Sequence, residues 1–429
     1  MSVKALPMRR PRTPPPRTPK KPKDVLFVHN NFPGQFGDLA LAMQKVGYRV
    51  AAIAAGKAPG VPGVPMARWG HKKGTTEGIF RAAIRAEADL IRARAAADSA
   101  MALKKQGFDP KVIVGHPGWG ETVGLKLIFP NAKQVLFGEF YYHGVGSDID
   151  FDTEFDPPDF DRSFIGYSKN ATLAMAYCEA EVIVCPTRYQ ASTLPEALQH
   201  RVRVIHEGVD TGRASPDLSA TLALPDGRVL DRSVPVFTHV NRHLEPLRGL
   251  HSFLRGLPKA LGELPEAQAI IIGNESASGY GGKAPDGRTW KQYFWDEVRG
   301  QLDESRVHFL GRTTHEQMIS AMRISAAHVY YTYPFVLSWS LLEAMSCECL
   351  VLASDTEPVR DAIQDGVNGR LLDFFDRAAL GEALIDAWRN KDAYAEVRKA
   401  ARRTVVENFD QATIGRPQWL DLVVGMAKG

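Results

Sequence analysis

Short apolar runs alternate with helical patterns along the whole chain. In the first half, these runs are bounded by polar residues, as is typical of buried strands, and they lie at 24–30, 48–54, 112–114, 135–137, 182–185 and 202–205. A glycine-containing turn and a helical pattern from Asp38 to Met43 follow the first run. Strand, turn, helix and strand in this order begin a βαβ unit, so the pattern predicts a parallel sheet.

The same alternation restarts in the second half. Strand patterns recur at 236–240, 269–272, 308–310, 328–332, 350–353 and 370–372, with helical patterns at 251–261, 315–325, 340–346, 357–364 and 377–390. Two successive halves of this kind predict an α/β protein with two Rossmann-like domains, whose parallel sheets face each other across a cleft.

The domain boundaries follow from breaks in this pattern. Residues 24–210 and 234–393 form the two domains, and 211–233 is expected to be a linker, because it lacks periodicity and carries Gly, Pro, Ser and Asp. An Ala-rich stretch at 75–106 predicts a long surface helix or a helix pair. Residues 394–429 are expected to be helices, broken near Pro417, that cross back to the first domain.

Composition changes this picture mainly at the N-terminus. Residues 1–23 hold eight Lys or Arg, seven Pro and no acidic residue, so the net charge of +4 for the whole chain becomes about −4 for the rest. Such a composition cannot bury apolar surface, and we expect a disordered tail. The tail is either simply solvated or contacts anionic lipid or an acidic partner.

Hydropathy and cysteine content indicate a cytoplasmic protein. No apolar run approaches the ~20 residues of a membrane-spanning helix, and no apolar stretch follows the basic N-terminus as in a secretory signal. Four cysteines in 429 residues do not make a disulfide framework, and Cys347 and Cys349 are too close for the usual zinc pairing. We therefore expect reduced thiols and no metal site, and peripheral contact with the inner membrane face only through the tail.

Two arginines follow the first strand of the second domain. Arg242 and Arg248 lie six residues apart around the turn-forming Pro246. A diphosphate at the carboxyl end of a strand needs cations, and arginine offers bidentate donors to phosphate oxygens. Cations fixed there would also stabilise the charge of a departing diphosphate. The alternative is a pair of ordinary surface arginines.

A second segment with candidate chemistry follows the strand at 328–332. A helix opens at Ser338, Trp339 and Ser340, and the free N–H groups of a helix N-terminus suit a phosphate. Glu343 lies one turn further, where a carboxylate can accept both hydroxyls of a ribose. The alternative is that Glu343 only offsets the helix dipole.

These segments resemble a known family. The runs at 340–347 (SLLEAMSC), 351–355 (VLASD) and 365–369 (DGVNG) are similar to the donor-site signature of family-4 retaining glycosyltransferases, which have the GT-B fold. In that family, the stretch matching 309–312 borders the nucleotide base, so the resemblance implies donor-binding roles for Gly311 and Arg312. Arg242 and Arg248 match its diphosphate-binding Arg and Lys. This resemblance covers about 236–372 and implies that 234–393 binds the nucleotide-sugar and 24–210 the acceptor.

The first half resembles the family more loosely. Gly34 and Gly37 match its glycine-rich loop that faces the donor phosphates. The stretches 116–122 and 138–143 are similar to a bacterial branch whose members are thought to build surface polysaccharides. His116 and His143 are therefore candidates for catalytic contact with the sugar or acceptor, and Glu139 for a further polar contact. Each of the histidines has a structural role as its alternative.

One position departs from the family pattern. The family has two glutamates eight residues apart, but Phe335 stands eight residues before Glu343. A phenyl ring cannot accept the hydrogen bond of a sugar hydroxyl. Three interpretations stay open: Ser338 or a backbone group contacts the sugar instead, the donor sugar is unusual, or the protein binds nucleotide without catalysis.

The expected function is metal-independent transfer of a hexose from a nucleoside-diphosphate sugar to a glycan or lipid-linked acceptor, with retention and without a cofactor. The resemblance implies a front-face route for retention. Alternatives are a sugar-nucleotide epimerase of the same fold, an inactive nucleotide-sugar binder and a tail-driven nucleic-acid binder; a nucleic-acid partner is not expected.

Two motif-like stretches are set aside. Acidic residues alternate over 148–156, but Thr153 and Asp159 stand where a calcium loop needs Gly and Glu, so we expect an acidic active-site flap or a solvated loop. The glycines over 279–287 lack the Gly-Lys-Ser/Thr ending of a phosphate loop, and we expect a mobile loop beside the donor site.

Overall fold

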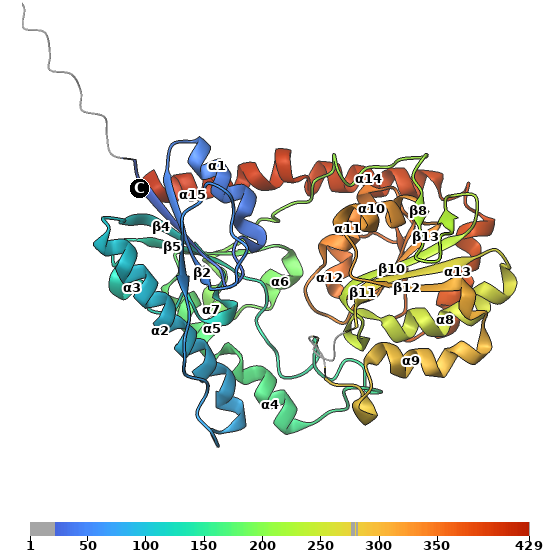
Figure 1. Ribbon diagram of the computed structural model, residues 1–429, viewed down its shortest axis with the longest axis horizontal. Coiled ribbons are helices and arrows are strands. Elements are labelled where there is room, and N and C mark those ends of the chain that lie inside the picture. Colours follow the sequence, from blue (N-terminus) through green and yellow to red (C-terminus); the bar gives the residue numbers. More distant parts are fainter. Residues whose placement is uncertain (1–21, 276–278, 280–281, 429) are drawn as a thin grey trace, which may run out of the picture.

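The computed structural model describes residues 22–275, 279 and 282–428. Two α/β domains lie side by side, and a pair of C-terminal helices runs along both of them (Figure 1). This confirms the predicted fold class. The tail lies outside the described residues except for Pro22 and Lys23, and the predicted loop at 279–287 lies partly outside them.

The first domain is built on a seven-stranded parallel sheet. Its strands, in spatial order, are β3 (Met66–Trp69), β2 (Arg49–Ala55), β1 (Asp24–Val28), β4 (Pro110–Gly115), β5 (Lys133–Phe137), β6 (Val182–Cys185) and β7 (Val202–Val204). The central strand β1 is buried at every position because helices cover both faces of the sheet. The edge strand β3 escaped the sequence analysis because only Trp69 of its four residues is buried.

Seven helices of the described chain belong to this domain. They are α1 (Gly37–Lys45), α2 (Ile84–Lys105), α3 (Leu125–Ile128), α4 (Phe160–Ser168), α5 (Asn170–Glu179), α6 (Arg188–Ser192) and α7 (Glu196–Gln199). The Ala-rich stretch is one long helix, α2, preceded by a 3₁₀ turn at Arg81–Ala83. Its alanines Ala93, Ala96 and Ala100 are buried, so small side chains let this helix lie close to the sheet.

The second domain has a six-stranded parallel sheet in the order of a dinucleotide-binding fold. Its strands, in spatial order, are β12 (Val307–Gly311), β11 (Gln268–Asn274), β10 (Val236–His243), β13 (Ala327–Tyr330), β14 (Val351–Ser354) and β15 (Arg370–Leu372). The flanking helices are α8 (Leu250–Glu263), α9 (Trp290–Val298), α10 (His315–Arg323), α11 (Trp339–Ser346), α12 (Glu357–Arg360) and α13 (Arg377–Arg389).

The segment 211–233 is more than the linker that we expected. It contains a two-stranded antiparallel hairpin, β8 (Leu222–Ala223) and β9 (Val229–Leu230). Leu222, Leu224 and Leu230 are buried in the core of the second domain. Because these apolar side chains are spaced irregularly, the sequence pattern did not reveal that the segment packs there.

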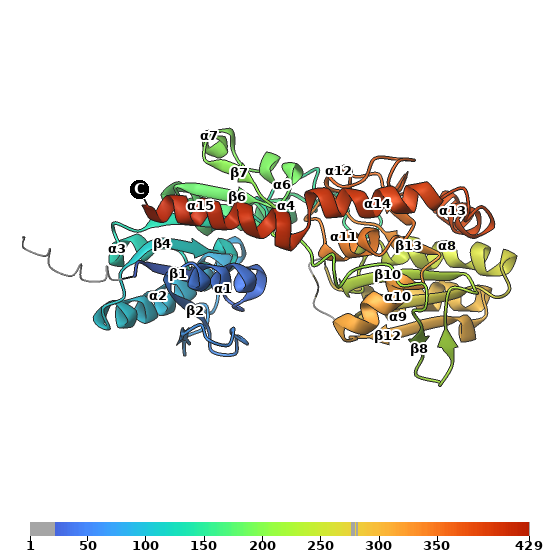
Figure 2. The same cartoon turned by 90° about the horizontal axis from the view of Figure 1, so that it is seen from above.

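Two C-terminal helices join the domains along one side (Figure 2). Helix α14 (Ala395–Asn408) packs on α11 of the second domain, and α15 (Arg416–Lys428) packs on α1 and β4 of the first. The break between them is at Phe409 and Asp410, before the Pro417 at which we expected it. Proline is tolerated in the first turn of a helix. Asp410 caps the π-helical turn Gln411–Gly415, which leads directly into α15, by accepting the N–H of Thr413 at 2.7 Å.

A strap formed by residues 147–156 connects the first domain to the second. Tyr333 donates to the buried Asp152 at 3.1 Å, and His251 Nε2 lies 3.1 Å from the same carboxylate oxygen. Glu154 forms ion pairs with Arg255 and Arg377 at 2.6 Å. These carboxylates are therefore bound to the second domain, and the expectation of an active-site flap or a solvated loop is wrong.

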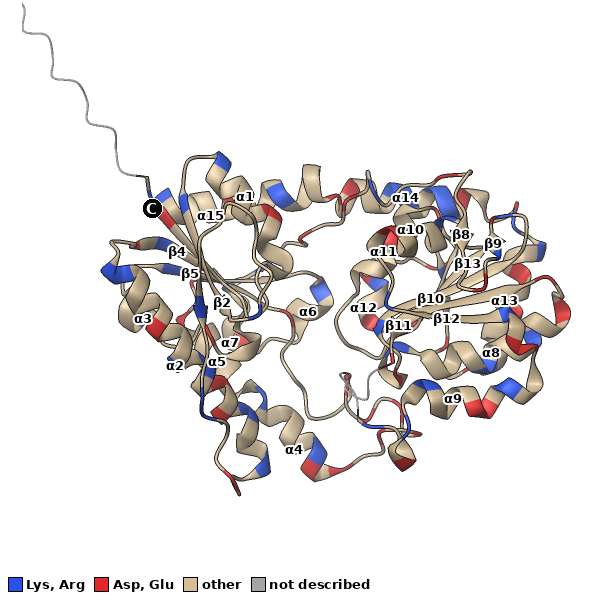
Figure 3. Cartoon of the chain, viewed as in Figure 1, with Lys and Arg blue, Asp and Glu red and all other residues tan. Residues whose placement is uncertain are grey.

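Charges of both signs are interspersed over the two domains in the view of Figure 3. Among the described helices, none combines the length and the apolar character needed to cross a membrane.

Candidate active site

The switch points of the two sheets bring four loops together. In each sheet the strand order reverses beside the first strand, between β1 and β4 and between β10 and β13. Ligands of open α/β sheets bind in the crevice beyond the carboxyl ends of such strands. The loops that follow these four strands supply residues to two adjoining cavities, of about 720 and 630 Å³.

The two cavities share one wall. The first lies on the second domain, and the second lies between the domains. Side chains common to both are Asn241, Arg242, His243, Ser338 and Trp339. The predicted residues Gly311, Arg312, Ser340 and Glu343 line only the first cavity, whereas Gly34, His116, Glu139 and Arg248 line only the second.

Arg248 is held rigidly beside the shared wall. It is 7% exposed, and its Nη1 donates to Thr332 Oγ1 and to the Val336 carbonyl, both at 3.0 Å. Gly249 follows with φ +69°, and a Cβ there would lie 2.2 Å from Cβ of Tyr331. Only glycine therefore lets the turn after β10 approach β13 and place the guanidinium at its acceptors. Arg242, by contrast, is exposed and lines both cavities.

The N-terminus of α11 completes the shared wall. Ser338 precedes the helix, and its Oγ accepts the Ser340 N–H at 3.3 Å. The Ser338 N–H donates to Tyr330 Oη at 2.8 Å, which fixes the entry of the chain into the helix. The first N–H groups of this helix thus lie near Arg242 at a surface suited to an anion.

Glu343 projects from the first turns of α11 into the first cavity. Its Oε1 lies 2.5 Å from His315 Nε2, and burial of the carboxyl raises its pKa although His315 opposes this effect. His315 is the first residue of α10 and also lines the cavity. Sequence reasoning missed His315. It lies three residues after the predicted Arg312 and directly after Thr314, which caps α10, and this position could have indicated that it lies at the same cavity.

His116 presents one ring nitrogen to the cavity between the domains. Its Nδ1 accepts the Gly118 N–H at 3.0 Å, which leaves the proton on Nε2, 3.4 Å from Oε2 of the half-exposed Glu139. The ring is 2% exposed and lies against Trp119, at 4.6 Å between centroids. His116 is therefore a fixed donor at this wall.

A second histidine, missed from the sequence, lies behind His116. His29 follows β1, and its ring is 5.4 Å from that of His116. Burial, and then the neighbouring His116, lower the pKa of His29 to about 3, so its ring is neutral. Gly34 has φ +50°, and a Cβ there would be 2.4 Å from His29 Nε2. The first loop needs this glycine in order to cover the histidine.

Three predicted residues lie away from both cavities. His143 Nε2 bonds to the Thr193 carbonyl at 3.0 Å, and Gly37 begins α1. Phe335 is buried, with its ring centroid 4.8 Å from that of Phe140 in the first domain and 5.6 Å from the Arg248 guanidinium. The Phe335 ring therefore contacts both domains and packs beside Arg248. The cavity between the domains is lined instead by the next three residues, Val336 to Ser338.

Within the described chain, no group of three or more His, Cys, Asp or Glu side chains is placed to hold a metal ion.

Two protein families match successive parts of the chain. Residues 46–214 match the glycosyl transferase family 4 group, and residues 229–404 match glycosyl transferases group 1. A phosphatidyl-myo-inositol mannosyltransferase of Mycobacterium tuberculosis is 29% identical over 228 residues, which are 51% of this chain and 53% of the relative. A D-inositol 3-phosphate glycosyltransferase of Mycobacterium sp. strain JLS is 28% identical over 202 residues, 46% of this chain and 42% of the relative. The chain spans about half the length of these curated relatives.

Solved structures match over nearly the whole length. A glycosyltransferase from Rickettsia africae has a TM-score of 0.65 at 15% identity, covering 95% of this chain and 99% of that chain. Anabaena HepE in complex with UDP and glucose has a TM-score of 0.61 at 15% identity, with the same coverage. These neighbours define the GT-B fold. The two family matches, over residues 46–214 and 229–404, show that the chain belongs to the family-4 glycosyltransferases.

Proposed function

We propose that the protein transfers a hexose-type sugar from a nucleoside-diphosphate sugar to a glycan or lipid-linked acceptor, with retention of anomeric configuration. The observation that carries this proposal is the wall shared by the two cavities. There, Arg242 and the N-terminus of α11 meet, and the buried Arg248 lies beside them. Cations and free N–H groups at the junction of two cavities suit a diphosphate that bridges them.

The donor would extend across that wall. Its nucleoside would occupy the first cavity, where Glu343 would accept ribose hydroxyls and Gly311 and Arg312 would border the base. Its sugar would enter the cavity between the domains, where His116 Nε2 and Glu139 provide a donor and an acceptor. UDP is a reasonable first donor nucleotide because HepE binds UDP and glucose in the same fold.

Charge drives the chemistry in this arrangement. Negative charge grows on the diphosphate as its bond to the sugar breaks, and fixed guanidinium groups stabilise that charge more than they stabilise the bound donor. We propose that these groups act without a metal ion and that the departing phosphate helps deprotonate the acceptor on the same face. Contact of the basic residues 1–23 with anionic lipid, at the cytoplasmic membrane face, belongs to the same proposal and is supported by their composition.

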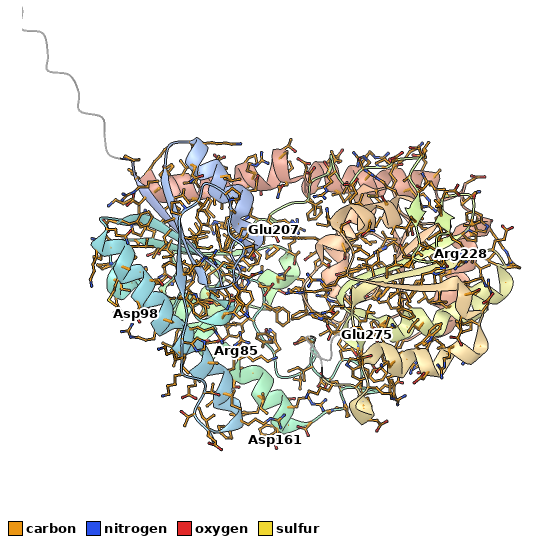
Figure 4. The ribbon with its side chains drawn as sticks, viewed as in Figure 1. Arg85, Asp98, Asp161, Glu207, Arg228 and Glu275 are labelled. Carbon is orange, nitrogen blue, oxygen red and sulfur yellow. The ribbon has the colours of Figure 1, made fainter. Side chains whose placement is uncertain are left out.

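Arginine variants test the proposal. A thermal-shift panel of UDP-, GDP- and ADP-sugars first identifies the donor, since a ligand that binds the native state raises its melting temperature. We expect Arg248→Ala and Arg242→Ala each to lower kcat/KM for transfer by more than about tenfold, because each removes a charge-assisted contact. The control is Arg228→Ala, whose side chain pairs with Asp226 on the outer hairpin (Figure 4). Near-normal transfer by both variants would contradict the proposal.

Two other functions are separated by their products. An epimerase of the same fold would convert the donor without an acceptor, so analysis of donor incubated alone detects it. The position of Phe335 keeps a non-catalytic binder as the second candidate, because a phenyl ring stands where the family has a sugar-contacting glutamate. Donor binding without transfer to any of a broad acceptor panel would favour that candidate.

A further inference from the structure

Two basic side chains line the first-domain side of the cavity between the domains. Arg85 projects from α2, and Lys169 lies at the junction of α4 and α5. Figure 4 places Arg85 on the domain opposite the one that carries Arg242 and Arg248. The proposed donor site uses neither residue, and sequence reasoning did not single out either of them.

Lys169 is a partly buried cation. Its Nζ lies 4.5 Å from the centre of the Tyr142 ring, which also lines the cavity. Among the described residues, no carboxylate lies at ion-pair distance from Nζ, and none accepts a hydrogen bond from it. Burial lowers the pKa of Lys169; the nearby Asp148 acts against this effect, and Arg85 adds to it. Arg85 and Lys169 line the same cavity, and the charge of Arg85 disfavours the protonated form of Lys169.

Arg85 is held in a fixed orientation. Its Nε donates to both oxygens of Asp89, at 2.8 and 3.0 Å, and its Nη2 donates to the Gly118 carbonyl. Asp89 is buried. It also forms an ion pair with Arg92 and accepts a hydrogen bond from Thr172 Oγ1 at 2.6 Å. Within the described part of the chain, Nη1 of Arg85 has no protein acceptor. The guanidinium thus presents unused N–H donors at the wall of the cavity.

Ion pairs among the described residues do not fully match these two cations, and Glu139, which lines the same cavity, lies beside His116 instead. Asp89 is the only carboxylate among the described residues that forms an ion pair with Arg85, and it also neutralises Arg92. Asp148 is near Lys169 without contacting its ammonium group, and burial raises the pKa of that carboxyl. A partly buried cation without an ion-pair partner carries a desolvation cost, and a ligand that brings negative charge reduces this cost. Two adjacent cations suit a phosphate ester, which carries close to two charges at pH 7.

We propose that Lys169 and Arg85 bind a phosphate group of the acceptor, with the Tyr142 ring as the adjoining wall. This inference rests on the proposed function, because it assigns the cavity between the domains to donor sugar and acceptor. The donor diphosphate is matched by Arg242 and Arg248 on the opposite domain, so the pair on the first domain is left for the second substrate. A soluble sugar phosphate and a phospholipid headgroup share this chemistry.

The experiment uses the full chain with saturating UDP, so that the donor phosphate site is filled. Melting temperatures are measured with glucose 6-phosphate and with glucose, at ionic strength matched with KCl. We expect glucose 6-phosphate to stabilise the UDP complex more than glucose does. Lys169→Ala should weaken this apparent affinity by about tenfold or more, because a contact between two charges is lost, whereas the shift caused by UDP stays unchanged.

Matched variants separate the site from general charge effects. Arg94→Ala on α2 is the control for Arg85→Ala, because Arg94 is exposed and pairs only with Asp98 among the described residues. Lys105→Ala, also exposed on α2, is the control for Lys169→Ala. If Arg85→Ala fails to fold because Asp89 loses a partner, Arg85→Lys and Lys169→Ala still test the site.

A second arm identifies the source of the phosphate. Co-sedimentation with phosphatidylcholine vesicles, with and without phosphatidylinositol, compares the full chain with its Lys169→Ala variant, so that lipid binding by the tail is the same in both. Loss of sedimentation in the variant indicates a headgroup, and loss of only the glucose 6-phosphate effect indicates a soluble phosphate. The proposal is overturned if Lys169→Ala responds to both probes like the unchanged chain, or if no phosphate probe acts on the UDP complex. If none of UDP, GDP and ADP gives a shift, the proposed function fails instead.

Discussion

At the scale of single residues, the contact between Glu343 and His315 shows how one carboxylate is prepared for a ligand. His315 bonds to Oε1 at 2.5 Å, which fixes the side chain, and among the described residues Oε2 has no hydrogen-bond partner in the first cavity. Phe335 shows the opposite case, because it lies at a family glutamate position but turns into the core, against Phe140 and Arg248. Two positions eight residues apart, Phe335 before α11 and Glu343 within it, thus differ in what they contribute to the site.

Replacing Glu343 tests its assigned partner. Glu343→Gln keeps the shape but removes the charge, so we expect about ten- to a hundredfold weaker UDP binding, in line with the loss of hydrogen bonds to a charged group. Isothermal titration calorimetry measures the affinity. The control is Glu316→Gln, which changes an exposed carboxylate on α10. Unchanged affinity in Glu343→Gln would remove the ribose role.

At the scale of elements, the second sheet buries titratable groups between its central strands. On β10, His239 Nδ1 bonds to the Val329 carbonyl at 3.2 Å, and on β13, His328 Nδ1 bonds to Thr238 Oγ1 at 2.9 Å. Burial lowers the pKa of His239 to about 4 and that of His328 to about 3. Both rings are therefore neutral near pH 7, and we expect acid to destabilise this sheet.

The direction in which stability changes with pH follows from the lowered pKa values of His239 and His328. Below about pH 6.5, the unfolded chain binds a proton at each histidine and the native protein does not. The free energy of unfolding should therefore fall on acidification, by up to about 1.4 kcal/mol per pH unit for each residue, until the native pKa is reached. Glu121 acts against this trend, because burial raises its pKa to about 7 and its native form takes up a proton first.

Comparing variants isolates the contribution of one histidine. We expect His328→Asn to reduce the slope of unfolding free energy against pH between 6 and 4, since one native-state group that resists protonation is gone. Urea denaturation at a series of pH values measures the slope. The exposed His200→Asn is the control. A slope equal to that of the unchanged protein would show that His328 is protonated in the fold.

At the scale of the whole molecule, the cleft is spanned by contacts from distant parts of the chain. The strap at 147–156 binds the second domain through Asp152 and Glu154. Trp339 Nε1 donates to Glu207 Oε1 at 2.7 Å, and Figure 4 shows Glu207 between the two halves. Helix α15 returns to the first domain, where Trp419 packs with Phe36 and Phe137. These contacts set the relative position of the two cavity walls.

The anchor of α15 is open to a direct test. Trp419 is buried, so Trp419→Ala should lower the free energy of unfolding by about 3–5 kcal/mol through lost packing and a residual cavity. Chemical denaturation measures the change. Gln418→Ala on the exposed side of the same helix is the control and should have little effect. Equal stability of the two variants would show that α15 is not anchored through this ring.

The amino-acid sequence alone determined the two sheets and the edge at which ligands bind. Strands of a parallel sheet are buried on both faces, so their apolar runs stand out, and residues that follow them must meet at one edge. Arg242, Ser338 and Glu343 were predicted for this reason, and they line the cavities. The predicted polysaccharide-building branch stays a prediction.

Only the tertiary structure decided which side chains face the cavity. His116 and His143 both follow strands of the first sheet. His116 packs against Trp119 and faces the cavity, whereas His143 bonds to the Thr193 carbonyl and lies away from it. Arg85 and Lys169 are 84 residues apart and carry no motif, so nothing local to either predicts that they line the same cavity. The direction of a side chain depends on what packs around it, and those partners come from distant parts of the chain.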